Sequence, residues 1–422
     1  MSLDFGVIAD DLTGGLIVAG MLEREGVACP LVTEADQAAL VGDCSALVIA
    51  RRFRLSPPAA AVADVEVTTR ALNGLGAKQV YYKYCATFDS TDDGNIGPCA
   101  DAIMRLRGVD RLGFCPAFPA VDVTVYQGHM FYKGALLSES AKRFDPVTPM
   151  PDSNLVRVLQ RQTRHKIDLV PRRIVHRGVA AVSSFVEDRV AAGIRYFIFD
   201  AIDDEDVRIC AGATADWPAM TGGDTLAQLA PAVHGMKKRT IAQKLPKTGG
   251  HEAILAGSCG AATLEQLSRF AAHHPVRTID LVDAAPDPER AIADAVDWAD
   301  DRKDKGPFAI ATSAPPDLVE RAHAALGREA AGHLGERLFS GLAKRLYDLG
   351  VRNFIVAGGE TSGIVVEALD IKRVDVAPMG DFGGGLCHAA APDPMSLLLK
   401  AGKMGGPDVF LCAFEEMRNF DG

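Results

Sequence analysis

Short apolar runs alternate with helical patterns along most of this chain, and the early runs end in polar or glycine-containing turns. Phe5–Ala9 leads through such a turn into a helical pattern at Leu16–Arg24, and Ala46–Ala50 precedes a helical segment at Pro57–Leu72. Further strands are predicted at Val80–Tyr84, Arg111–Cys115, Arg195–Phe199, Glu252–Ala256, Ala309–Thr312 and Asn353–Ala357. Strands that alternate with helices of about ten or more residues are typical of α/β proteins with a largely parallel sheet.

The length of 422 residues is enough for two or three domains at about 150 residues each. The strongest candidate boundary is Lys237–Gly250, where a basic cluster is followed by proline and glycine. Such a segment is typical of a linker, although a surface loop within one domain would look the same. We therefore expect an α/β fold with two domains, residues 1–240 and 250–422, each built on a largely parallel sheet flanked by helices.

The charge balance narrows the range of partners. Forty-five lysine and arginine residues stand against 55 aspartate and glutamate residues, which gives a net charge of −10. Nucleic acids and anionic membranes select clustered basic residues, so neither is expected as the main partner. A small anionic molecule stays compatible with this balance, because a few local cations suffice to bind it.

Cysteine usage and the apolar runs bear on the compartment. The nine cysteines include no C-x-x-C pair, which favours a reducing environment over a disulfide framework. The start of the chain lacks the pattern of a signal peptide, and no charge-free apolar stretch approaches the roughly 18 residues that a membrane helix requires. We therefore expect a cytoplasmic protein. A homo-oligomer is one open alternative for its assembly.

Polar side chains gather directly after the first three predicted strands. Asp10 and Asp11 follow the first strand, Arg54 belongs to a basic turn after the second, and Lys83 lies in the third. The loop after the third strand contains Asp89, Ser90, Thr91 and Asn95. Because ligands of open α/β sheets bind at the carboxyl ends of the strands, we expect one crevice to hold these groups if the three strands are neighbours.

Such a mixture suits a hydroxylated carboxylic acid. Arginine can bind a carboxylate through two parallel hydrogen bonds, Asp, Asn, Ser and Thr exchange hydrogen bonds with hydroxyls, and a free aspartate could take a proton from an attacking hydroxyl. Two plainer explanations stay open. Asp10 and Asp11 could simply cap the first helix, and the arginine turn could be a solvated surface loop.

The second half of the chain carries three glycine-bearing segments instead. A glycine-rich turn between a strand and a helix lets backbone N–H groups approach a phosphate closely, so a nucleotide phosphate site is expected. Tight turns also use glycine for steric reasons alone, which remains the alternative. The segments are 256–260, which contains Ser258; Gly358, Gly359, Glu360, Thr361, Ser362 and Gly363; and 400–406, which contains Gly402 and Gly405. Helical patterns follow the first segment at Ala261–Ala272 and the second at Ile364–Leu369.

Familiar nucleotide motifs are absent from this sequence. It contains neither the P-loop pattern G-x-x-x-x-G-K-[ST] nor a G-x-G-x-x-G that opens a helix after a strand. The tripeptide Asp381-Phe382-Gly383 matches the metal-binding triplet of protein kinases, but the catalytic-loop and lysine-strand motifs of those enzymes do not accompany it. We interpret that match as coincidental.

Several runs, taken together, resemble the four-carbon acid sugar kinase family over nearly the full length of the chain. In the first half these runs lie at 8–14, 83–98 and 115–119, and the 83–98 segment looks closest to the 3-oxo-tetronate kinase branch, as do residues 124–129 and 148–155. In the second half they lie at 358–363, 399–402 and 405–406.

This resemblance implies an N-terminal domain that binds the acid sugar and a C-terminal domain that binds ATP. It implies transfer of the γ-phosphoryl group to a terminal hydroxyl of a short sugar acid, with ATP and Mg²⁺ as cofactors and no assigned metal ligands. Asp10 or Asp11 would accept the hydroxyl proton. The residues that would face the acid sugar are Arg54, Lys83, Asp89, Ser90, Thr91 and Asn95. Those that would contact ATP are Ser258, Gly358, Gly359, Glu360, Thr361, Ser362, Gly363, Gly402 and Gly405.

The chain departs from the usual pattern of the branch at four places, all in the substrate half: residues 14–17, the turn 51–54, Asp93, and residues 120–124. We therefore expect a 3-oxo-tetronate or a related oxo-acid, including a branched one such as 3-oxo-isoapionate, as substrate. Two alternatives stay open. One is a sensor that binds sugar acid and nucleotide without turnover, and the other is a nicotinamide-dependent enzyme, which the missing dinucleotide fingerprint disfavours.

Overall fold

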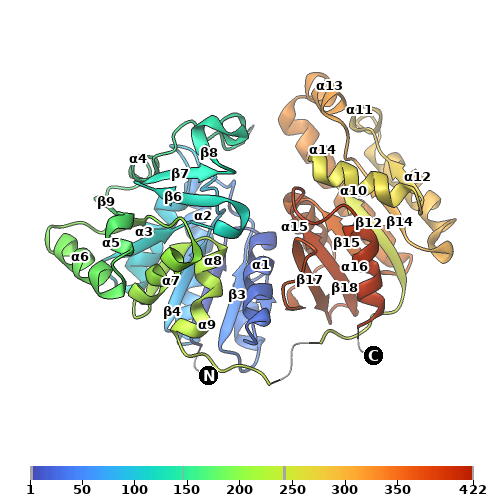
Figure 1. The fold of residues 1–422 in the computed structure, drawn as a ribbon. Helices are drawn as coiled ribbons and strands as arrows, with labels where there is room; N and C mark the ends of the chain where they lie inside the picture. The colour runs from blue at the N-terminus through green and yellow to red at the C-terminus, as the bar shows by residue number, and fades with distance from the viewer. Residues whose placement is uncertain (1–2, 146, 241–243, 421–422) are drawn as a thin grey trace. The chain divides into compact units, whose positions relative to one another are not determined.

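The computed structural model describes residues 3–145, 147–240 and 244–420. It divides into two compact units, Met1–Ile241 and Ala242–Gly422, drawn from blue to green and from yellow to red in Figure 1. Each unit is an α/β unit of its own. The predicted boundary segment Lys237–Gly250 includes residues 241–243, which lie outside the described residues.

The first unit is built on a parallel sheet with the strand order β2-β3-β1-β4-β11-β5-β10-β9. Every pairing between these neighbours is parallel. All five residues of β1, β3 and β4 are buried, as expected for a parallel sheet covered on both faces. The strands are β1 (Phe5–Ala9), β2 (Leu31–Val32), β3 (Ala46–Ala50), β4 (Gln79–Lys83), β5 (Leu112–Cys115), β9 (Ile167–Val170), β10 (Tyr196–Phe199) and β11 (Ala219–Gly222).

Helices cover both faces of this sheet (Figure 1). On one face, apolar side chains of α2 and α3 join Ile8, Leu47 and Tyr82 in one buried cluster. On the other face, α1 packs at Gly15 against Ala9, Val48 and Ala50. The helices are α1 (Leu12–Arg24), α2 (Pro58–Gly74), α3 (Ile96–Arg107), α4 (Leu155–Gln160), α5 (Arg172–Val175), α6 (Val179–Ala191), α7 (Asp204–Ala213), α8 (Asp224–Gln228) and α9 (Ala230–Val233), with a 3₁₀ segment at Ala35–Leu40.

A small antiparallel sheet is inserted between β5 and α4. It consists of β6 (Val123–Tyr126), β7 (His129–Tyr132) and β8 (Ala135–Leu136), and 3₁₀ turns at Pro119–Val121, Leu137–Glu139 and Ala141–Phe144 flank it. The buried carboxylate of Asp200, at the end of β10, accepts hydrogen bonds from the backbone nitrogens of Gln127 and Gly128 at 2.8 and 2.9 Å. Both residues have positive φ, so Asp200 holds the left-handed turn of this hairpin in place.

The order of the strands creates a switch point between β1 and β4. The chain leaves β1 through α1 toward β2 and β3, on one side, whereas it leaves β4 through α3 toward β5, on the other. Connections that diverge in this way leave an open crevice at the carboxyl ends of the two strands. The polar residues that follow β1, β3 and β4 therefore lie where a ligand of this unit is expected.

The second unit has the strand order β13-β14-β12-β15-β18-β17-β16. The first five strands are parallel, and β17 and β16 continue the sheet in antiparallel fashion. The strands are β12 (His251–Ala256), β13 (Val276–Thr278), β14 (Phe308–Ala311), β15 (Val351–Ala357), β16 (Arg373–Val376), β17 (Gly384–Ala389) and β18 (Met395–Lys400). Because β12, β15 and β18 are neighbours, the three glycine-bearing segments that follow them share one edge.

Helices also flank this second sheet (Figure 1). Side chains of α10 and α16 form a buried apolar cluster with Ile254, Ile355 and Leu398 of the central strands. The helices are α10 (Ala261–Ala271), α11 (Leu281–Ala284), α12 (Pro288–Asp300), α13 (Pro316–Leu326), α14 (Arg328–Asp348), α15 (Gly359–Ala368) and α16 (Val409–Arg418), with a 3₁₀ turn at Lys303–Lys305. Among the helices that the structure describes, none is both long enough and apolar enough to cross a membrane.

The predicted α/β architecture with largely parallel sheets is confirmed, and each predicted strand overlaps an observed strand within one or two residues at its ends. Two helix starts differ from the prediction. The helix predicted from Leu16 begins at Leu12, because Asp11 caps it. The helix predicted from Ile364 begins at Gly359, so most of the glycine-rich run forms its first turn rather than a loop.

The contact of α1 with the sheet predicts how two glycines differ in their tolerance of alanine. A Cβ atom on Gly15 would lie 2.9 Å from Cβ of Ala50 and 3.1 Å from Cγ1 of Val48, whereas one on Gly74 in α2 would meet no described atom within 4 Å. Gly15→Ala should lower the free energy of unfolding by about 1–3 kcal/mol. Gly74→Ala, the matched control, should leave it unchanged or raise it by up to about 1 kcal/mol. Urea unfolding measures both, and an increase for Gly15→Ala would contradict this packing.

Candidate active site

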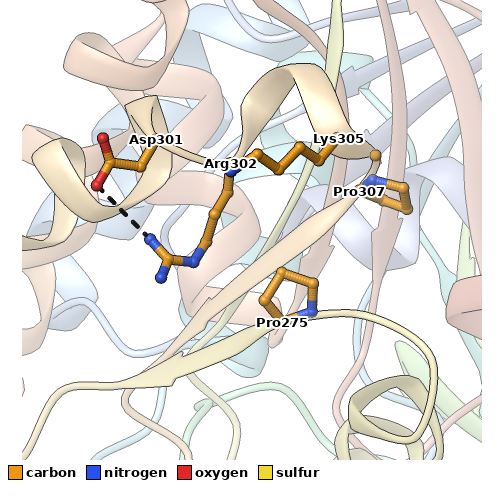
Figure 2. Close-up of a pocket in the computed structure, with 6 residues that line it drawn as sticks. Pro275, Asp301, Arg302, Lys305 and Pro307 are labelled. Atoms are coloured by element: carbon orange, nitrogen blue, oxygen red, sulfur yellow. Dashed lines mark ion pairs between the residues drawn. The ribbon is translucent and has the colours of Figure 1, made fainter.

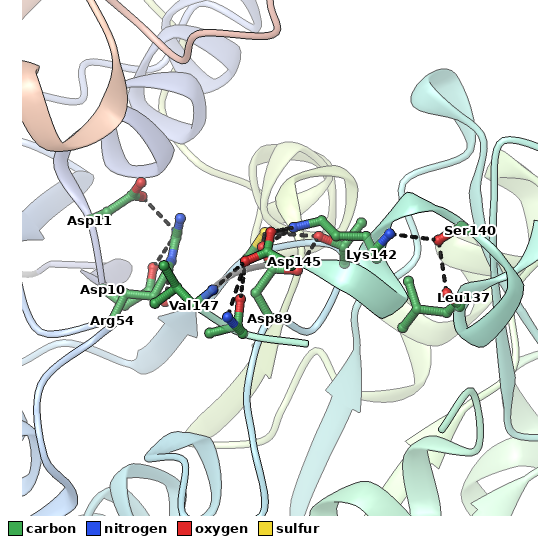
Figure 3. Close-up of polar contacts among 12 residues, drawn as sticks. Asp10, Asp11, Arg54, Asp89, Leu137, Ser140, Lys142, Asp145 and Val147 are labelled. Atoms are coloured by element: carbon green, nitrogen blue, oxygen red, sulfur yellow. Dashed lines mark hydrogen bonds and ion pairs between the residues drawn. The ribbon is translucent and has the colours of Figure 1, made fainter. Parts of the chain in front are cut away.

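A buried ion pair joins the ends of β1 and β3 in the first unit. Arg54 donates from Nε to Oδ2 of Asp10 at 2.9 Å and from Nη2 to Oδ1 at 2.6 Å, a bidentate arrangement. The same Nη2 atom lies 2.8 Å from Oδ1 of Asp11. One guanidinium group thus bridges both predicted carboxylates, as Figure 3 shows.

The two aspartates differ in their surroundings. Asp11 is the N-cap of α1: its side chain accepts from the backbone nitrogen of Gly14 and from the hydroxyl of Thr13, both at 2.9 Å. Burial acts to raise its pKa, but Arg54, Lys83 and these hydrogen bonds lower it below the usual value. Burial raises the pKa of Asp10, and the attraction of Arg54 offsets this only in part. Asp11 is therefore both a structural cap and a carboxylate held in its charged form.

Lys83, the last residue of β4, brings a second cation to the same place. Its side chain is only 3% exposed and its Nζ atom lies 3.4 Å from Oδ1 of Asp224. A Cβ atom on Gly14 would lie 3.3 Å from this Nζ atom and 3.7 Å from Nη2 of Arg54. Lysine and arginine thus converge over the first turn of α1, where the missing side chain of Gly14 leaves room for them.

Asp224, the first residue of α8, is a member of this cluster that the sequence did not reveal. The hydroxyl of Tyr81 donates to the carbonyl of Gly223 at 2.6 Å and so fixes the backbone beside it. Burial raises the pKa of Asp224, against the opposing attraction of Lys83. Asp224 follows β11, a strand of four residues that ends in glycine and shows no strand pattern, so the sequence offered no signal for it.

A second polar group surrounds Asp89. This carboxylate accepts from Nζ of Lys142 and from the hydroxyl of Thr87, both at 2.6 Å, and from the thiol of Cys85 at 3.3 Å. Nζ of Lys142 also donates to Asp145 at 3.3 Å. Burial acts to raise the pKa of Asp89, but Lys142, Thr87 and, more weakly, Arg54 lower it. Figure 3 shows this group together with the Arg54 group.

Lys142 reaches Asp89 from the 3₁₀ turn that follows the small antiparallel sheet. It could not be found from the sequence, because 53 residues separate it from Asp89 and no motif marks it. The insertion therefore supplies a cation to the candidate site.

The other predicted substrate residues hold the backbone around the site. The buried amide nitrogen of Asn95 donates to the carbonyls of Phe53, Arg54 and Ser56 at 2.8, 3.2 and 3.0 Å. The Nε2 atom of Gln162 donates to the hydroxyl of Ser90 at 2.8 Å and to the carbonyl of Thr91 at 2.6 Å. Asn95 thus fixes the turn that carries Arg54, and Gln162, which the sequence did not single out, holds the loop after Asp89.

The basic turn after β3 divides between two roles. Arg51 forms ion pairs with Glu34 and with Asp64, the latter at 2.9 Å, and so joins the turn to α2 and to the segment after β2. Arg54, in contrast to Arg51, forms its ion pair with Asp10. The alternative of a solvated surface loop therefore fits neither arginine.

In the second unit glycines allow close packing where the glycine-bearing segments meet. A Cβ atom on Gly402 would lie 1.8 Å from Oγ of Ser258, and one on Gly358, whose φ is +134°, would lie 2.8 Å from Oγ1 of Thr361. The hydroxyl of Thr263 donates to the carbonyl of Gly402 at 2.8 Å. These glycines are therefore required for the backbone segments to meet, and a narrow polar cradle results.

Gln266 of α10 anchors the third segment. Its Nε2 atom donates to the carbonyls of Met404, Gly405 and Gly406 at 3.1, 3.0 and 3.1 Å. No pattern in the sequence marks this role, since a single glutamine within a helical pattern has many ordinary explanations.

One cavity of the second unit lies elsewhere. A hollow of about 420 Å³ is lined by Pro275, Asp301, Arg302, Lys305, Gly306 and Pro307 (Figure 2). It is at the amino ends of β13 and β14, which begin at Val276 and Phe308, whereas the glycine-bearing segments follow the carboxyl ends of their strands. The ion pair between Asp301 and Arg302 at its rim is long, at 4.0 Å, and solvent-exposed. We do not assign it to the active site.

Two families of known domains match the two halves of this chain. Residues 5–229 match a sugar-binding N-terminal domain, and residues 253–410 match a nucleotide-binding C-terminal domain. A 3-oxo-tetronate kinase of Burkholderia multivorans is 39% identical over 411 residues, covering 96% of this chain and 95% of the relative. The chain belongs to the four-carbon acid sugar kinase family. A second 3-oxo-tetronate kinase, of Methylobacterium radiotolerans, is 38% identical to this family member over 99% of the chain and 100% of its own length.

Two solved structures share the fold of this sugar-acid kinase. A protein of Salmonella typhimurium LT2 superimposes with a TM-score of 0.86 at 32% identity, covering 98% of this chain and 99% of that one. It has been described provisionally as a tRNA synthase, whereas both curated relatives above are named as kinases. A Haemophilus influenzae protein gives a TM-score of 0.77 at 33% identity, covering 98% of this chain and 100% of its own.

The residues around the glycine-bearing segments of this kinase could hold the phosphates of a nucleotide. Within the described residues, no group of three or more His, Cys, Asp or Glu side chains is arranged to hold a metal ion. Mg²⁺ in kinases is usually bound through one or two carboxylates together with the substrate phosphates, so a magnesium ion that arrives with a nucleotide needs no such group. The cradle of backbone around Gly358 and Gly402 is suited to phosphate oxygens.

The contacts of Asn95 predict a stability effect that depends on its nitrogen. Asn95→Asp replaces a donor by an acceptor facing three carbonyls, and we expect the free energy of unfolding to fall by about 1–3 kcal/mol. Asn154→Asp is the matched control, because Asn154 caps α4 through its oxygen and aspartate caps equally well. Urea unfolding compares the two, and equal stability of Asn95→Asp and wild type would contradict the assigned role.

Proposed function

We propose that this protein is an ATP-dependent kinase that phosphorylates a terminal hydroxyl of a 3-oxo-tetronate or a related oxo-acid, including a branched one such as a 3-oxo-isoapionate. The observation that carries the proposal is the cluster of Arg54 and Lys83 with Asp10 and Asp11 at the switch point of the first sheet. Its two cations can bind the carboxylate of an acid, and its two carboxylates can accept hydrogen bonds from a hydroxyl. The names of the curated relatives support the same substrate class.

Lys83 and Arg54 are proposed to bind the substrate carboxylate. Both already form ion pairs in this site: Lys83 with Asp224, and Arg54 with Asp10 and Asp11. Because Arg54 is held from one side by Asp10, its planar group is oriented before substrate arrives, which reduces the entropy lost on binding. Asp89, held by Lys142 and Thr87, is proposed to accept a hydrogen bond from a substrate hydroxyl.

Of the two candidate bases, Asp11 suits the role better than Asp10. Both oxygens of Asp10 accept from Arg54 and its side chain is only 3% exposed, whereas that of Asp11 is 17% exposed. Phosphoryl transfer has a loose transition state, so the group beside the attacking hydroxyl needs above all to orient it and to take its proton late. A carboxylate with a lowered pKa, such as Asp11, can do both. Asp10 is then the residue that positions Arg54.

The remaining predicted residues of the first unit receive supporting roles. Asn95 is proposed to position the Arg54 turn rather than to touch substrate, because its amide nitrogen is engaged by three carbonyls. Ser90 and Thr91 are proposed to shape the loop that carries Asp89 through their contacts with Gln162.

In the second unit, Ser258, Gly358–Gly363, Gly402 and Gly405 are proposed to contact the nucleotide. Bound Mg²⁺ and ATP would supply the γ-phosphoryl group and neutralise its charge. The residues themselves offer backbone N–H groups at the start of α15 and α10, where the helix dipole favours anions. A cytoplasmic location stays a prediction from the sequence.

Coupled ADP release with Mg²⁺ and ATP tests the proposal across tetronates, 3-oxo-tetronates and branched 3-oxo-acids. We expect saturable turnover with at least one oxo-acid and none with ATP alone. Binding of an acid and of ATP, each measured by calorimetry, without ADP release would contradict a kinase and favour a sensor.

The assignment of Asp11 predicts a specific loss of turnover. Asp11→Asn keeps a side chain that caps helices well, so the fold should persist, while kcat should fall roughly 10²- to 10⁴-fold. Asp188→Asn, at an exposed position of α6, is the matched control and should leave kcat unchanged. Normal kcat for Asp11→Asn would show that another group takes the proton.

A further inference from the structure

Lys400 is the last residue of β18 in the second unit, and its side chain is buried without a hydrogen-bond partner among the described residues. The residue is 0% exposed. Its backbone is firmly placed: its carbonyl accepts from the backbone nitrogen of Gly358 at 2.9 Å, and it pairs across the sheet with Gly384. The backbone of Lys400 therefore lies at the edge where the glycine-bearing segments meet, and its Nζ atom lies 5.8 Å from the centroid of the Phe410 ring.

An isolated ammonium group is costly to bury. Removing a charge from water without a compensating partner disfavours the charged form strongly, and burial accordingly lowers the pKa of Lys400 to about 8. The ring of Phe410, with its centroid 5.8 Å from Nζ, compensates only weakly. Phosphate groups are anions that could provide the missing partner.

The start of α16 adds a second positive feature at the same place. Phe410 is the second residue of this ten-residue helix, so the ring near Nζ of Lys400 belongs to the first turn of α16. The N-terminal end of a helix carries a partial positive charge and unpaired N–H groups. Its N-cap, Asp408, makes no capping hydrogen bond through its side chain and instead lies 3.4 Å from Arg269. A lysine at this end of a helix is unfavourable unless an anion joins it.

Two further buried polar atoms near this edge lack a partner among the described residues. They are Oε1 of Gln266, whose nitrogen anchors the 404–406 carbonyls, and Oγ of Ser362 in the first turns of α15. Together with Nζ of Lys400 they belong to the elements that border the glycine-bearing segments. Buried polar atoms without a partner call for an explanation, and a bound ligand is one. The Ser362 hydroxyl can donate to a phosphate oxygen, whereas the Gln266 oxygen can only accept a hydrogen bond, for example from a ligand hydroxyl.

We propose that the ammonium group of Lys400 and the N-terminus of α16 bind phosphate oxygens of the nucleotide. This inference rests on the proposed nucleotide site of the same unit and adds to it a charged contact that the glycine segments cannot supply. Backbone N–H groups orient phosphate oxygens, and the lysine neutralises part of their charge. Lys400 thus acts as a binding residue, and its burial excludes water from the contact and strengthens it.

Calorimetric titration of Lys400→Met with ADP, pyrophosphate and adenosine tests this proposal, with Lys344→Met at an exposed position of α14 as the matched control. We expect the Kd of ADP and of pyrophosphate to rise roughly 10- to 100-fold in Lys400→Met, as for the loss of one charge-assisted contact. Adenosine binding should be unchanged, and Lys344→Met should match wild type throughout.

Thermal unfolding of the ligand-free variants separates binding from a structural role. Because Lys400→Met removes an unpaired buried charge, its Tm should equal or exceed that of wild type. An unchanged Kd for ADP would overturn the proposal, and so would a loss of folding in both Lys400→Met and Lys400→Gln. If wild type binds ADP but phosphorylates no acid, the proposed substrate fails while the Lys400 assignment is still decided by these titrations. If wild type binds no ADP, both the proposed nucleotide site and the assignment of Lys400 are wrong.

Discussion

Parallel strands end at a common edge, and this constraint determines where both candidate sites form. In the first unit β1, β3 and β4 are neighbours, so Asp10, Arg54 and Lys83 meet although up to 73 residues separate them in the chain. In the second unit the neighbours β12, β15 and β18 bring three glycine-bearing segments together. The same rule of topology thus gathers charged side chains in one unit and nearly bare backbone in the other.

The cations at the carboxyl ends of the two sheets differ in their partners: those of the first unit form ion pairs, and Lys400 of the second forms none within the described part of the chain. This difference agrees with the ligand proposed for each unit. In the first unit the cations Arg54 and Lys83 are each paired with carboxylates, which keeps them charged and oriented while the site is empty. A substrate carboxylate can join such a network without leaving a buried charge alone. In the second unit Lys400 has no such partner among the residues that the structure describes. We propose that a phosphate anion provides the negative charge that the Lys400 ammonium group lacks.

The sequence predicted the residues that lie next to regular strands and missed those positioned by tertiary contacts. Asp10, Asp11 and Lys83 could be found because apolar runs end directly before or at them, and Arg54 because it lies in the basic turn that follows such a run. Asp224 follows a short strand that contains glycine, and Lys142 comes from an insertion far along the chain, so neither has a local signal. For Asp11 the functional and capping explanations proved compatible, since one carboxylate caps α1 and contacts Arg54.

The glycine-rich run of the second half shows another limit of sequence reasoning. Its residues were expected to form a turn before a helix at Ile364, yet the helix begins at Gly359. Gly358, with a φ of +134°, makes the turn alone, and the following polar residues then form the first helical turns. Local propensity disfavours glycine in a helix, and the packing of this segment against β15 and β18 overrides it.

Phosphorus NMR of the reaction products shows whether this protein transfers the γ-phosphoryl group of ATP to a sugar acid. With Mg²⁺, ATP and a 3-oxo-tetronate, we expect ADP together with an equal amount of a new phosphomonoester, and consumption of the acid in the same proportion. Inorganic phosphate as the sole new phosphorus signal beside ADP would contradict it, because ATP would then be hydrolysed rather than used to phosphorylate the acid.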